Sequence, residues 1–437
     1  MQSASSQRVR ALTGQLRAAQ GSSFANATSV VDEFPALRSD VFVLDELLTT
    51  EETQLRQKIR MFAEREVAPI INQYWEKAEF PHQLLPKLGA LGIGGCNQKG
   101  YGCSGHSLMS EGIIMMELAR VDPSISLCFL VHDSLCMYTI GALGSEDQKR
   151  KYLPKLAAFE HVGCWAMTEP EWGSDAASLA TTATQVEGGW RLDGAKRWIG
   201  NSPFADVCVC FARNAHTGLV NAFILEPKTL PGWSVCKMEN KTGMRVVQNG
   251  DITLEGVVVP ESSRLPGATD FAAATSALAA SRLVVAWQPV GMAMGIYDAC
   301  LRYLCERTQF GAPLAALQIN QEKLMRMLGT IQGMILMAWR VTRMAENNKA
   351  TPGLASLTKA TLTMRGREVA SLGRELLGGN GIVHDFHVAK VFNDMEAVHT
   401  YEGTYEVNML IAAREVTGIA AFKPRIQSTT NNSRSKL

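Results

Sequence analysis

The sequence predicts an α+β protein in which a small β domain lies between two helical regions. Before residue 161, apolar residues such as Leu55, Ile59 and Phe62 recur at helical spacing. Between residues 163 and 267 the pattern changes to short β-type runs that are separated by turn signals, such as Glu-Gly-Gly at 187–189. Helical spacing returns from residue 271. Because 437 residues exceed the roughly 250–300 that one core can hold, two or three domains are expected.

These changes in pattern divide the chain into consecutive segments. We expect an N-terminal extension (1–43), an N-terminal α-helical domain (44–162), a middle β domain (163–270), a C-terminal helical domain (271–423) and a tail (424–437). Strands are expected near residues 190–192, 207–212, 222–225 and 251–259. Long helices are expected over residues 281–306, 318–347 and 354–377.

Composition excludes several classes of partner. A formal net charge of +1 gives no electrostatic footprint for nucleic acid. No apolar run approaches the roughly 20 residues that span a bilayer, because His132 and Asp133 interrupt the run at 126–131. A soluble protein without a membrane span is therefore expected. The 10 cysteines are scattered and show no zinc-ligand spacing, so we expect reduced thiols and no metal site.

Both ends of the chain carry features of targeting signals. Ser435, Lys436 and Leu437 form the terminal S-K-L tripeptide that the peroxisomal import receptor recognises. The first 31 residues contain arginines and no acidic residue, which also suits a mitochondrial transit peptide. Within them, Arg8-Val9 and Gln15-Leu16 resemble an N-terminal peroxisomal nonapeptide. Together the two ends favour the peroxisome.

Residues 165–175, WAMTEPEWGSD, resemble the T-E-P-x-x-G-S-D signature of the acyl-CoA dehydrogenases and acyl-CoA oxidases. Its proline and glycine suit a loop whose backbone N–H groups and hydroxyls meet a flavin and a phosphorylated ligand. The resemblance implies FAD contacts from Trp165, Ala166, Met167, Thr168, Gly173 and Ser174, with Ser174 also at the substrate.

Residues 196–202, KRWIGNS, resemble the K-x-W-I-T-N-G/S strand of the same family, which lies against the flavin ring. The resemblance implies flavin contacts from Trp198, Ile199 and Gly200. Gly200 replaces the usual threonine, so a hydroxyl that commonly bonds the flavin near N5 is missing. This loss is expected to alter how the reduced ring meets oxygen or an electron acceptor.

Residues 401–406, YEGTYE, match the family element whose glutamate is the catalytic base, which implies that role for Glu402. A carboxylate fits because the proton α to a thioester is weakly acidic, and burial beside an apolar ligand raises the pKa of the base. Thr404 and Glu406 are implied neighbours of the cofactor. Ser281 and Arg282 are expected to open a long helix and to bind the nucleotide end of CoA.

Two further segments imply contacts with FAD, and the first of them implies a contact between subunits. Residues 307–311, RTQFG, with Gln318 downstream, resemble the element whose Arg and Phe contact the FAD of a neighbouring subunit. Residues 375–381, ELLGGNG, resemble the turn that receives the adenine side of FAD. A homodimer or homotetramer is therefore expected, with contacts from Arg307, Phe310, Gln318, Glu375, Gly378 and Gly379.

Taken together, the resemblance implies an acyl-CoA dehydrogenase-like fold with a C-terminal four-helix bundle, FAD as cofactor and acyl-CoA as substrate. The product would be trans-2-enoyl-CoA. Residues 99–103 (KGYGC) and 287–289 (WQP) most resemble the short, plant-type peroxisomal acyl-CoA oxidases of short-chain substrates, which pass electrons to O₂ and form H₂O₂.

Three alternatives remain beside the oxidase. A dehydrogenase would pass the electrons to an electron-transfer flavoprotein. A glutaryl-CoA dehydrogenase is disfavoured, because that group keeps an Arg about where Ser126 stands. A non-catalytic CoA-ester scaffold is disfavoured because Glu402 is present.

Overall fold

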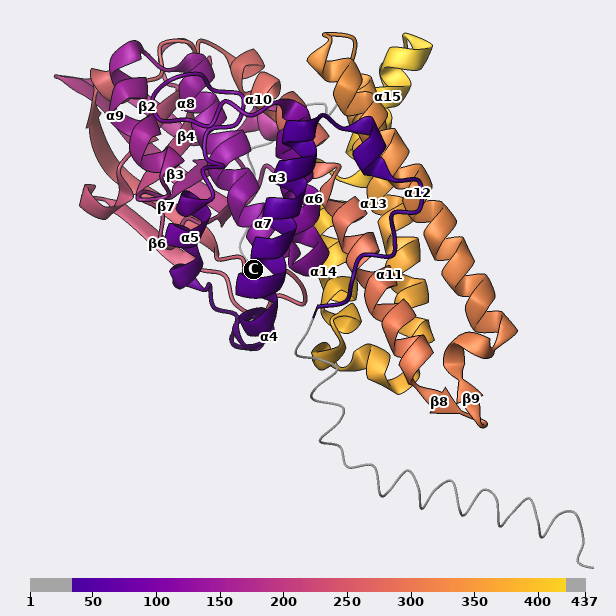
Figure 1. The fold of residues 1–437 in the computed structure, drawn as a ribbon. Helices are drawn as coiled ribbons and strands as arrows, with labels where there is room; N and C mark the ends of the chain where they lie inside the picture. The colour runs from indigo at the N-terminus through magenta and orange to yellow at the C-terminus, as the bar shows by residue number, and fades with distance from the viewer. Residues whose placement is uncertain (1–33, 422–437) are drawn as a thin grey trace, which may run out of the picture.

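The computed structural model describes residues 34–421 and has the predicted α–β–α order. Figure 1 shows the N-terminal helices beside a sheet at one side of the molecule, and the long C-terminal helices bundled at the other. The α+β class predicted from the sequence is confirmed. The tail at 424–437, with S-K-L, and residues 1–33 lie outside the described residues.

The N-terminal helices begin where the sequence offers a cap. Thr49 forms a capping box with Glu52 at the start of α3, and Ser145 forms one with Gln148 at the start of α9. Helix α6 is buried along almost its whole length and forms the centre of this domain. The helices are α3 (Thr50–Phe62), α4 (Ala68–Lys77), α5 (Leu85–Ala90), α6 (Leu108–Val121), α7 (Pro123–Leu130), α8 (Tyr138–Leu143) and α9 (Glu146–Ala157), with the π-helical segments η2 (Ala63–Val67) and η4 (Val131–Met137).

The helices α7, η4 and α8 run on from one another over Pro123–Leu143, and this corrects one expectation from the sequence. By length and composition alone the stretch is able to cross a membrane, with a mean hydropathy of 1.4 over its most apolar window. His132 and Asp133 do not interrupt it. Of that window, 83% is buried inside the fold, as in the core helix of a folded protein.

The middle domain is a seven-stranded sheet in the order β1-β4-β2-β3-β7-β6, with β5 paired to β4. Strand β1 runs parallel to β4, and β3 pairs antiparallel with β7. The register of β3 against β7 shifts between Lys196 and Ile199, which marks a β-bulge. The strands are β1 (Gly163–Ala166), β2 (Thr182–Val186), β3 (Gly189–Gly200), β4 (Val207–Asn214), β5 (Val220–Leu225), β6 (Trp233–Lys237) and β7 (Asn249–Pro260).

The C-terminal domain is a helical bundle centred on α13, which packs against α10, α11, α12, α14 and α15. The helix expected over 281–306 is in fact two helices, because the chain breaks at Ala286 and Trp287 and Pro289 then sits in the first turn of the next helix. The elements are α10 (Phe271–Val285), α11 (Gln288–Glu306), the hairpin β8 (Thr308–Gln309) and β9 (Ala312–Pro313), α12 (Gln318–Glu346), α13 (Pro352–Leu376), α14 (Val388–Thr400) and α15 (Tyr405–Thr417).

Residues 34–43, the last part of the predicted N-terminal extension, are packed against the helical domains. The backbone N–H of Arg38 donates to Asp298 Oδ1 at 2.8 Å, and Arg120 Nη2 donates to the carbonyl of Pro35 at 2.6 Å. Further on, the N–H of Phe42 donates to Gln332 Oε1 at 3.0 Å. This segment therefore belongs to the folded domain and ties the N-terminal helices to the C-terminal bundle.

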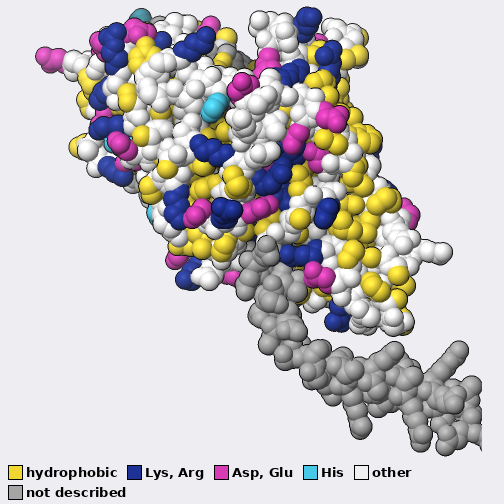
Figure 2. All heavy atoms as spheres, in the orientation of Figure 1, with side chains coloured by type: hydrophobic (Ala, Val, Ile, Leu, Met, Phe, Trp, Pro, Cys, Tyr) yellow, Lys and Arg dark blue, Asp and Glu magenta, His cyan; other side chains and the backbone are white. Residues whose placement is uncertain are grey.

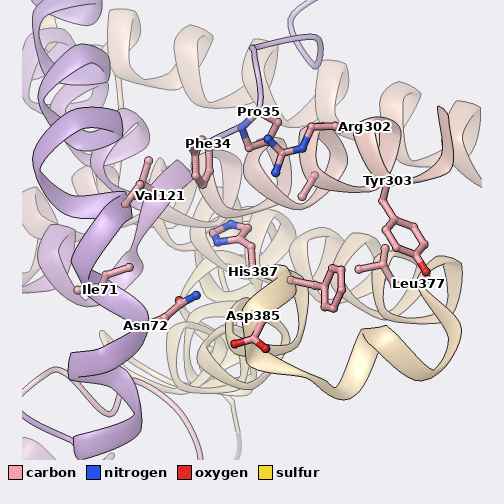
Figure 3. Close-up of a pocket in the computed structure, with 13 residues that line it drawn as sticks. Phe34, Pro35, Ile71, Asn72, Val121, Arg302, Tyr303, Leu377, Asp385 and His387 are labelled. Atoms are coloured by element: carbon pink, nitrogen blue, oxygen red, sulfur yellow. The ribbon is translucent and has the colours of Figure 1, made fainter. Parts of the chain in front are cut away.

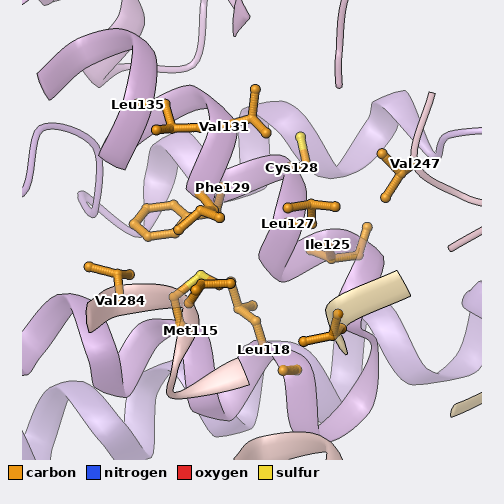
Figure 4. Packing of buried hydrophobic residues seen from close by; sticks show 14 of the residues in the cluster. Met115, Leu118, Ile125, Leu127, Cys128, Phe129, Val131, Leu135, Val247 and Val284 are labelled. Carbon is orange, nitrogen blue, oxygen red and sulfur yellow. The ribbon is translucent and has the colours of Figure 1, made fainter. Parts of the chain in front are cut away.

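One apolar core joins the domains. Figure 4 shows side chains of α6, α7 and η4 meeting Val247, which lies before β7, and Val284 of α10. Phe129 and Leu118 are 0% and 1% exposed within this cluster. The cluster fixes η4 between the sheet and α10, and these two elements carry the site residues described next.

Candidate functional site

Glu402 lies in the turn between α14 and α15, in the left-handed backbone region with φ 55°. Such a conformation is uncommon for a residue with a side chain and needs support from its surroundings. Ser281 Oγ donates a 2.8 Å hydrogen bond to Glu402 Oε2. Arg282 Nε donates to the backbone carbonyl of Glu402 at 3.4 Å. The end of α10 therefore faces the base predicted from the sequence.

The surroundings of Glu402 favour a carboxyl group that holds its proton more tightly than usual. Burial raises its pKa, while the Ser281 hydrogen bond and the positive charges of Arg282 and Lys359 lower it, so that a net rise remains. The residue as a whole keeps part of its surface exposed. A base with a raised pKa takes up a proton more readily than an ordinary carboxylate.

The turn is held by two residues that the sequence analysis did not single out. Lys359, fully buried on α13, donates from Nζ to the carbonyls of His399 at 3.1 Å and Gly403 at 2.8 Å. Asn408 Nδ2 lies 2.8 Å from the same Gly403 carbonyl. Burial lowers the pKa of Lys359 to about 8. The sequence signal that could have pointed to Lys359 is a charged residue within the apolar helical pattern of residues 354–377.

The expected place of Ser281 and Arg282 needs correction. We predicted that both open a helix, which is wrong, and that both bind the nucleotide end of CoA, which remains a prediction. In the structure they lie near the end of α10, and their side chains are directed at the Glu402 turn. Tertiary packing of α10 against α13 brings them there, although 120 positions in sequence separate Arg282 from Glu402.

The two segments that resemble flavin-binding elements meet in space. The N–H of Arg197 donates to the carbonyl of Thr168 at 2.8 Å, which joins the loop after β1 to the bulge in β3. At the bulge Trp198 has φ 65° and is 54% exposed, so its ring projects from the sheet. Gly173 and Ser174 are exposed in the facing loop, and no atom lies within 4 Å of the place where a Cβ on Gly173 would sit.

A buried ion pair shapes the same loop. Lys196 Nζ donates to Glu169 Oε1 at 2.8 Å and to the carbonyl of Met167 at 3.2 Å. The Glu169 carboxylate also accepts the backbone N–H groups of Ala180 and Thr181. The pair lies inside the two motifs, yet the sequence analysis gave no role to either residue. Only the fold shows that the motifs are joined to each other through it.

Trp165, Ala166, Met167 and Ile199 are buried in the core, between 0% and 8% exposed. The indole Nε1 of Trp165 donates to Thr139 Oγ1 at 3.1 Å, and its ring packs against Phe211. Its side chain is thus engaged inside the protein. Any contact of this residue with a cofactor would have to come from the backbone.

Gly200 lies at the end of β3 against η4. A Cβ placed on it would sit 3.2 Å from Val131 Cγ2, which is closer than ordinary van der Waals contact. A threonine side chain at position 200 would therefore meet Val131, which occupies part of the space beside Gly200. The pairing of residues 131 and 200 was not visible in the sequence.

The residues predicted to contact the FAD of a neighbouring subunit, and those predicted to receive the adenine side of FAD, lie away from Glu402 on the outside of the bundle. Phe310 is 89% exposed on the β8–β9 hairpin, and Arg307 and Gln318 flank it as exposed residues. Gly378 and Gly379 are exposed after α13. Glu375 accepts a 2.7 Å hydrogen bond from Lys323 Nζ of α12, which lowers its pKa.

Thr404 and Glu406 have local roles in the structure. Thr404 caps α15 by accepting the N–H of Val407 at 3.3 Å, and Glu406 is exposed in the first turn of that helix. Thr404 therefore sets where the helix after Glu402 begins.

A cavity of about 60 Å³ lies elsewhere, where α4, α6 and α11 meet residues 385–387. Figure 3 shows Phe34 and His387 facing it, with Asp385 and Tyr303 at its edge. Its lining includes none of the predicted site residues. Among residues 34–421, no group of three or more His, Cys, Asp or Glu side chains is arranged to hold a metal ion.

Comparison with known proteins decides the family. The sequence matches the acyl-CoA dehydrogenase N-terminal domain over residues 49–160, the middle domain over 164–257 and the C-terminal domain over 271–417. An acyl-CoA dehydrogenase of Bacillus subtilis is 32% identical over 377 residues, which is 85% of this chain and 99% of that protein. The chain belongs to the acyl-CoA dehydrogenase family.

Other members of the acyl-CoA dehydrogenase family agree with this assignment. The mitochondrial short-chain specific acyl-CoA dehydrogenase of Bos taurus is 32% identical over 365 residues, covering 82% of this chain and 88% of that protein. The structure of a glutaryl-CoA dehydrogenase from Mycobacterium smegmatis in complex with FADH2 matches with a TM-score of 0.85 and 32% identity, covering 88% of this chain and 99% of that one. The predicted family is thus confirmed, and its finer division remains a prediction.

Proposed function

We propose that this chain is an FAD enzyme that removes one hydrogen from the α carbon and one from the β carbon of a short-chain acyl-CoA, with Glu402 as the base. The observation that carries the proposal is the Glu402 carboxyl group, which has a raised pKa and is fixed by Ser281 at 2.8 Å. A base held in one orientation is what abstraction of a weakly acidic carbon-bound proton requires.

The middle domain supports FAD as the cofactor. The exposed Trp198 ring and the open space at Gly173 lie on two segments that Arg197 and Thr168 join. An exposed tryptophan offers a flat face, and a glycine lets a ligand approach the backbone closely. The glutaryl-CoA dehydrogenase of the same fold was solved with FADH2. When bound, FAD supplies the two-electron acceptor for the hydrogen from the β carbon.

The role of the chain in this reaction is to move one proton and to stabilise the charge that develops. The Glu402 carboxylate takes the α hydrogen as a proton, and the electron pair of that C–H bond becomes the new double bond. The β hydrogen leaves with its own electron pair, as a hydride, and trans-2-enoyl-CoA remains. Because Ser281 and Lys359 favour the charged form of Glu402, they keep part of the base ionised before substrate arrives.

The structure favours a monocarboxylic acyl group over a dicarboxylic one. Ser126 is fully buried, donates to the carbonyl of Pro123 at 2.9 Å and accepts from Gln288 Nε2 at 2.7 Å. Its hydroxyl is thus already engaged by protein groups. A distal carboxylate would find no cation at this position, and burying an unpaired charge is costly.

For the electron acceptor we propose an electron-transfer flavoprotein as the first candidate. The relatives described above are named as dehydrogenases, and this supports the dehydrogenase over the oxidase that residues 99–103 and 287–289 suggest. The half-reaction at Glu402 is the same in either case. The two candidates differ only in how the reduced cofactor is reoxidised.

Molecular oxygen is the second candidate, and Gly200 is the observation that favours it. Where the family usually has a threonine hydroxyl, the backbone here is bare and Val131 lies beside it. The S-K-L end, outside the described residues, also fits a peroxisomal oxidase that forms H₂O₂. Release of peroxide in air during turnover of butanoyl-CoA would decide for oxygen. Bleaching of the flavin without peroxide would decide for a protein acceptor.

The central test is Glu402→Gln. Anaerobic mixing of the flavin-loaded protein with butanoyl-CoA should bleach the wild-type flavin, whereas the variant should lose the rate by about 10²–10⁴-fold, the usual contribution of a general base. Flavin content should stay the same, because Gln keeps the shape of the side chain. Equal bleaching rates in the two proteins would refute Glu402 as the base.

We also propose that the protein is a homodimer or homotetramer. Figure 2 shows hydrophobic side chains gathered on the face of the bundle that carries α12, where Ile319 and Met325 are 67% and 56% exposed. Phe310 extends this exposed apolar surface on the adjacent hairpin. Burial of such a surface favours association. Sedimentation of the wild type and of Phe310→Ala would test it, and a wild-type monomer would refute it.

Localisation to the peroxisome is a proposal that rests on Ser435, Lys436 and Leu437. A fluorescent fusion at the N-terminus should enter peroxisomes, and the same fusion without the last three residues should remain outside. Unchanged import after the deletion would show that the targeting signal lies in another part of the chain.

A further inference from the structure

Tyr401, the residue before Glu402, is hydrogen-bonded to α11, whereas Glu402 and Gly403 are held by residues of α10 and α13. The phenol Oη of Tyr401 donates a hydrogen bond to Oε1 of Gln288, the first residue of α11. Gln288 is fully buried. Burial raises the pKa of the Tyr401 phenol well above its usual value, so the phenol keeps its proton and remains a donor.

Gln288 is held in one orientation. Its Nε2 donates to the carbonyl of Pro123 at 2.8 Å and to Ser126 Oγ at 2.7 Å, both at the start of α7. Because a carbonyl only accepts, the amide nitrogen has to face Pro123, and the amide oxygen then has to face the Tyr401 hydroxyl. Every polar atom of this side chain thus has a partner that suits it.

The anchors of the turn come from opposite sides. After Glu402, Lys359 and Asn408 bind the Gly403 carbonyl. Before Glu402, the Tyr401 side chain is bound by Gln288. The left-handed conformation of Glu402, which is unfavourable for a residue with a side chain, is therefore fixed from both ends.

We propose that Gln288 is a positioning residue for the base, acting through the Tyr401 hydroxyl to fix the direction of the Glu402 carboxylate relative to the start of α7. This inference rests on the proposed function, because it assigns to Gln288 a part in the reaction of Glu402. Gln288 itself touches neither the base nor the reacting atoms.

The test uses the full-length, flavin-loaded protein and two variants that break the same hydrogen bond from either side, Gln288→Leu and Tyr401→Phe. The matched control is Thr342→Val, which removes the 3.0 Å bond from Nε1 of Trp287, the neighbour of Gln288, to a buried hydroxyl that does not reach the turn. Anaerobic flavin reduction by butanoyl-CoA is measured for each protein, together with flavin content and melting temperature.

Each of the two variants should slow flavin reduction by about 10–100-fold, since a displacement near 1 Å costs up to 10²-fold. The butanoyl-CoA concentration for half-maximal rate should change less than threefold, and the control should stay within twofold of wild type. The double variant should be no slower than the slower single variant, because both changes break one bond. Hydrogen exchange of the amides of residues 401–408 should quicken in both variants and not in the control.

Wild-type reduction rates in Gln288→Leu and Tyr401→Phe would overturn the proposal. The proposal would also be overturned if the rate losses of the single variants multiplied in the double variant and tracked losses of flavin content and melting temperature. That pattern would indicate a purely structural role. If butanoyl-CoA fails to bleach even the wild-type flavin, the proposed function fails. The exchange of residues 401–408 then still tests the anchor by itself, and unchanged exchange would overturn it.

Discussion

Ser281 Oγ, near the end of α10, donates a 2.8 Å hydrogen bond to Oε2 of Glu402 in the turn before α15. The hydroxyl stabilises the charged carboxylate, in a place where burial favours the neutral acid. These two opposing effects set the pH range over which Glu402 ionises.

Ser281→Ala should move the pH dependence of flavin reduction to higher pH. Only the ionised form of Glu402 accepts a proton, so the rate rises as pH rises through the pKa of this group. The Ser281 hydrogen bond lowers that pKa, and its removal therefore raises it. Stopped-flow reduction by butanoyl-CoA across pH 5–9 checks the shift. Ser281→Thr keeps the hydroxyl and should retain the wild-type profile, and a downward shift in the alanine variant would contradict the argument.

Lys359→Met should destabilise the protein by about 1–3 kcal/mol, since it removes the lysine donor from the carbonyl of His399 and leaves the carbonyl of Gly403 with Asn408 as its side-chain donor. It should also raise the pKa of Glu402, because a neighbouring positive charge is lost. Urea unfolding measures the first effect and the pH profile of flavin reduction the second.

The matched control is Lys323→Met, which breaks the surface pair with Glu375 and should cost less than about 1 kcal/mol. If both lysine variants were equally stable, the buried anchor at Gly403 would be unimportant.

Glu111→Gln should flatten the dependence of stability on pH. Glu111 and Asp133 are both buried, and burial raises the pKa of each, to about 7 for Glu111. The folded state thus keeps a proton that the unfolded state has lost. Wild-type stability should fall as pH rises from the ordinary carboxyl value to about 7, which is the range over which Glu111 contributes.

The glutamine keeps hydrogen-bonding atoms for Asn97 and Ser134 and does not titrate. Melting temperatures between pH 4.5 and 8 would show the flattening. Glu368→Gln, on the exposed part of α13, should leave the wild-type slope in place. If the melting temperature of Glu111→Gln fell with pH as steeply as that of the wild type, Glu111 and Asp133 would not be the cause of the pH dependence.

Gly200→Ala should destabilise the protein by about 1–3 kcal/mol, because the new Cβ meets Val131 Cγ2 at 3.2 Å. Val131→Ala in the same protein should recover part of this loss by opening space, although it also removes buried apolar surface. Chemical unfolding of both single variants and the double variant measures the coupling. Additive losses would show that residues 131 and 200 do not compete for the same space.

The α–β–α order could be predicted from the sequence, because helical and strand spacing differ wherever one face is buried. The sequence also determined which segments to examine, since the spacing of T-E-P-x-x-G-S-D and Y-E-G-T is specific. Glu402 was found in this way. The contacts of residues 34–43 could not be predicted in this way, because their backbone binds Asp298 and Gln332, which are distant in sequence.

The residues that surround Glu402 are brought together by tertiary packing. Arg282 and Lys359 lie 120 and 43 positions before Glu402, and Gln288 reaches the turn through Tyr401. No local pattern encodes these contacts, because they arise from how α10, α11 and α13 pack around one another. The sequence thus supplied the carboxylate, and the packing of three helices supplied its orientation and its raised pKa.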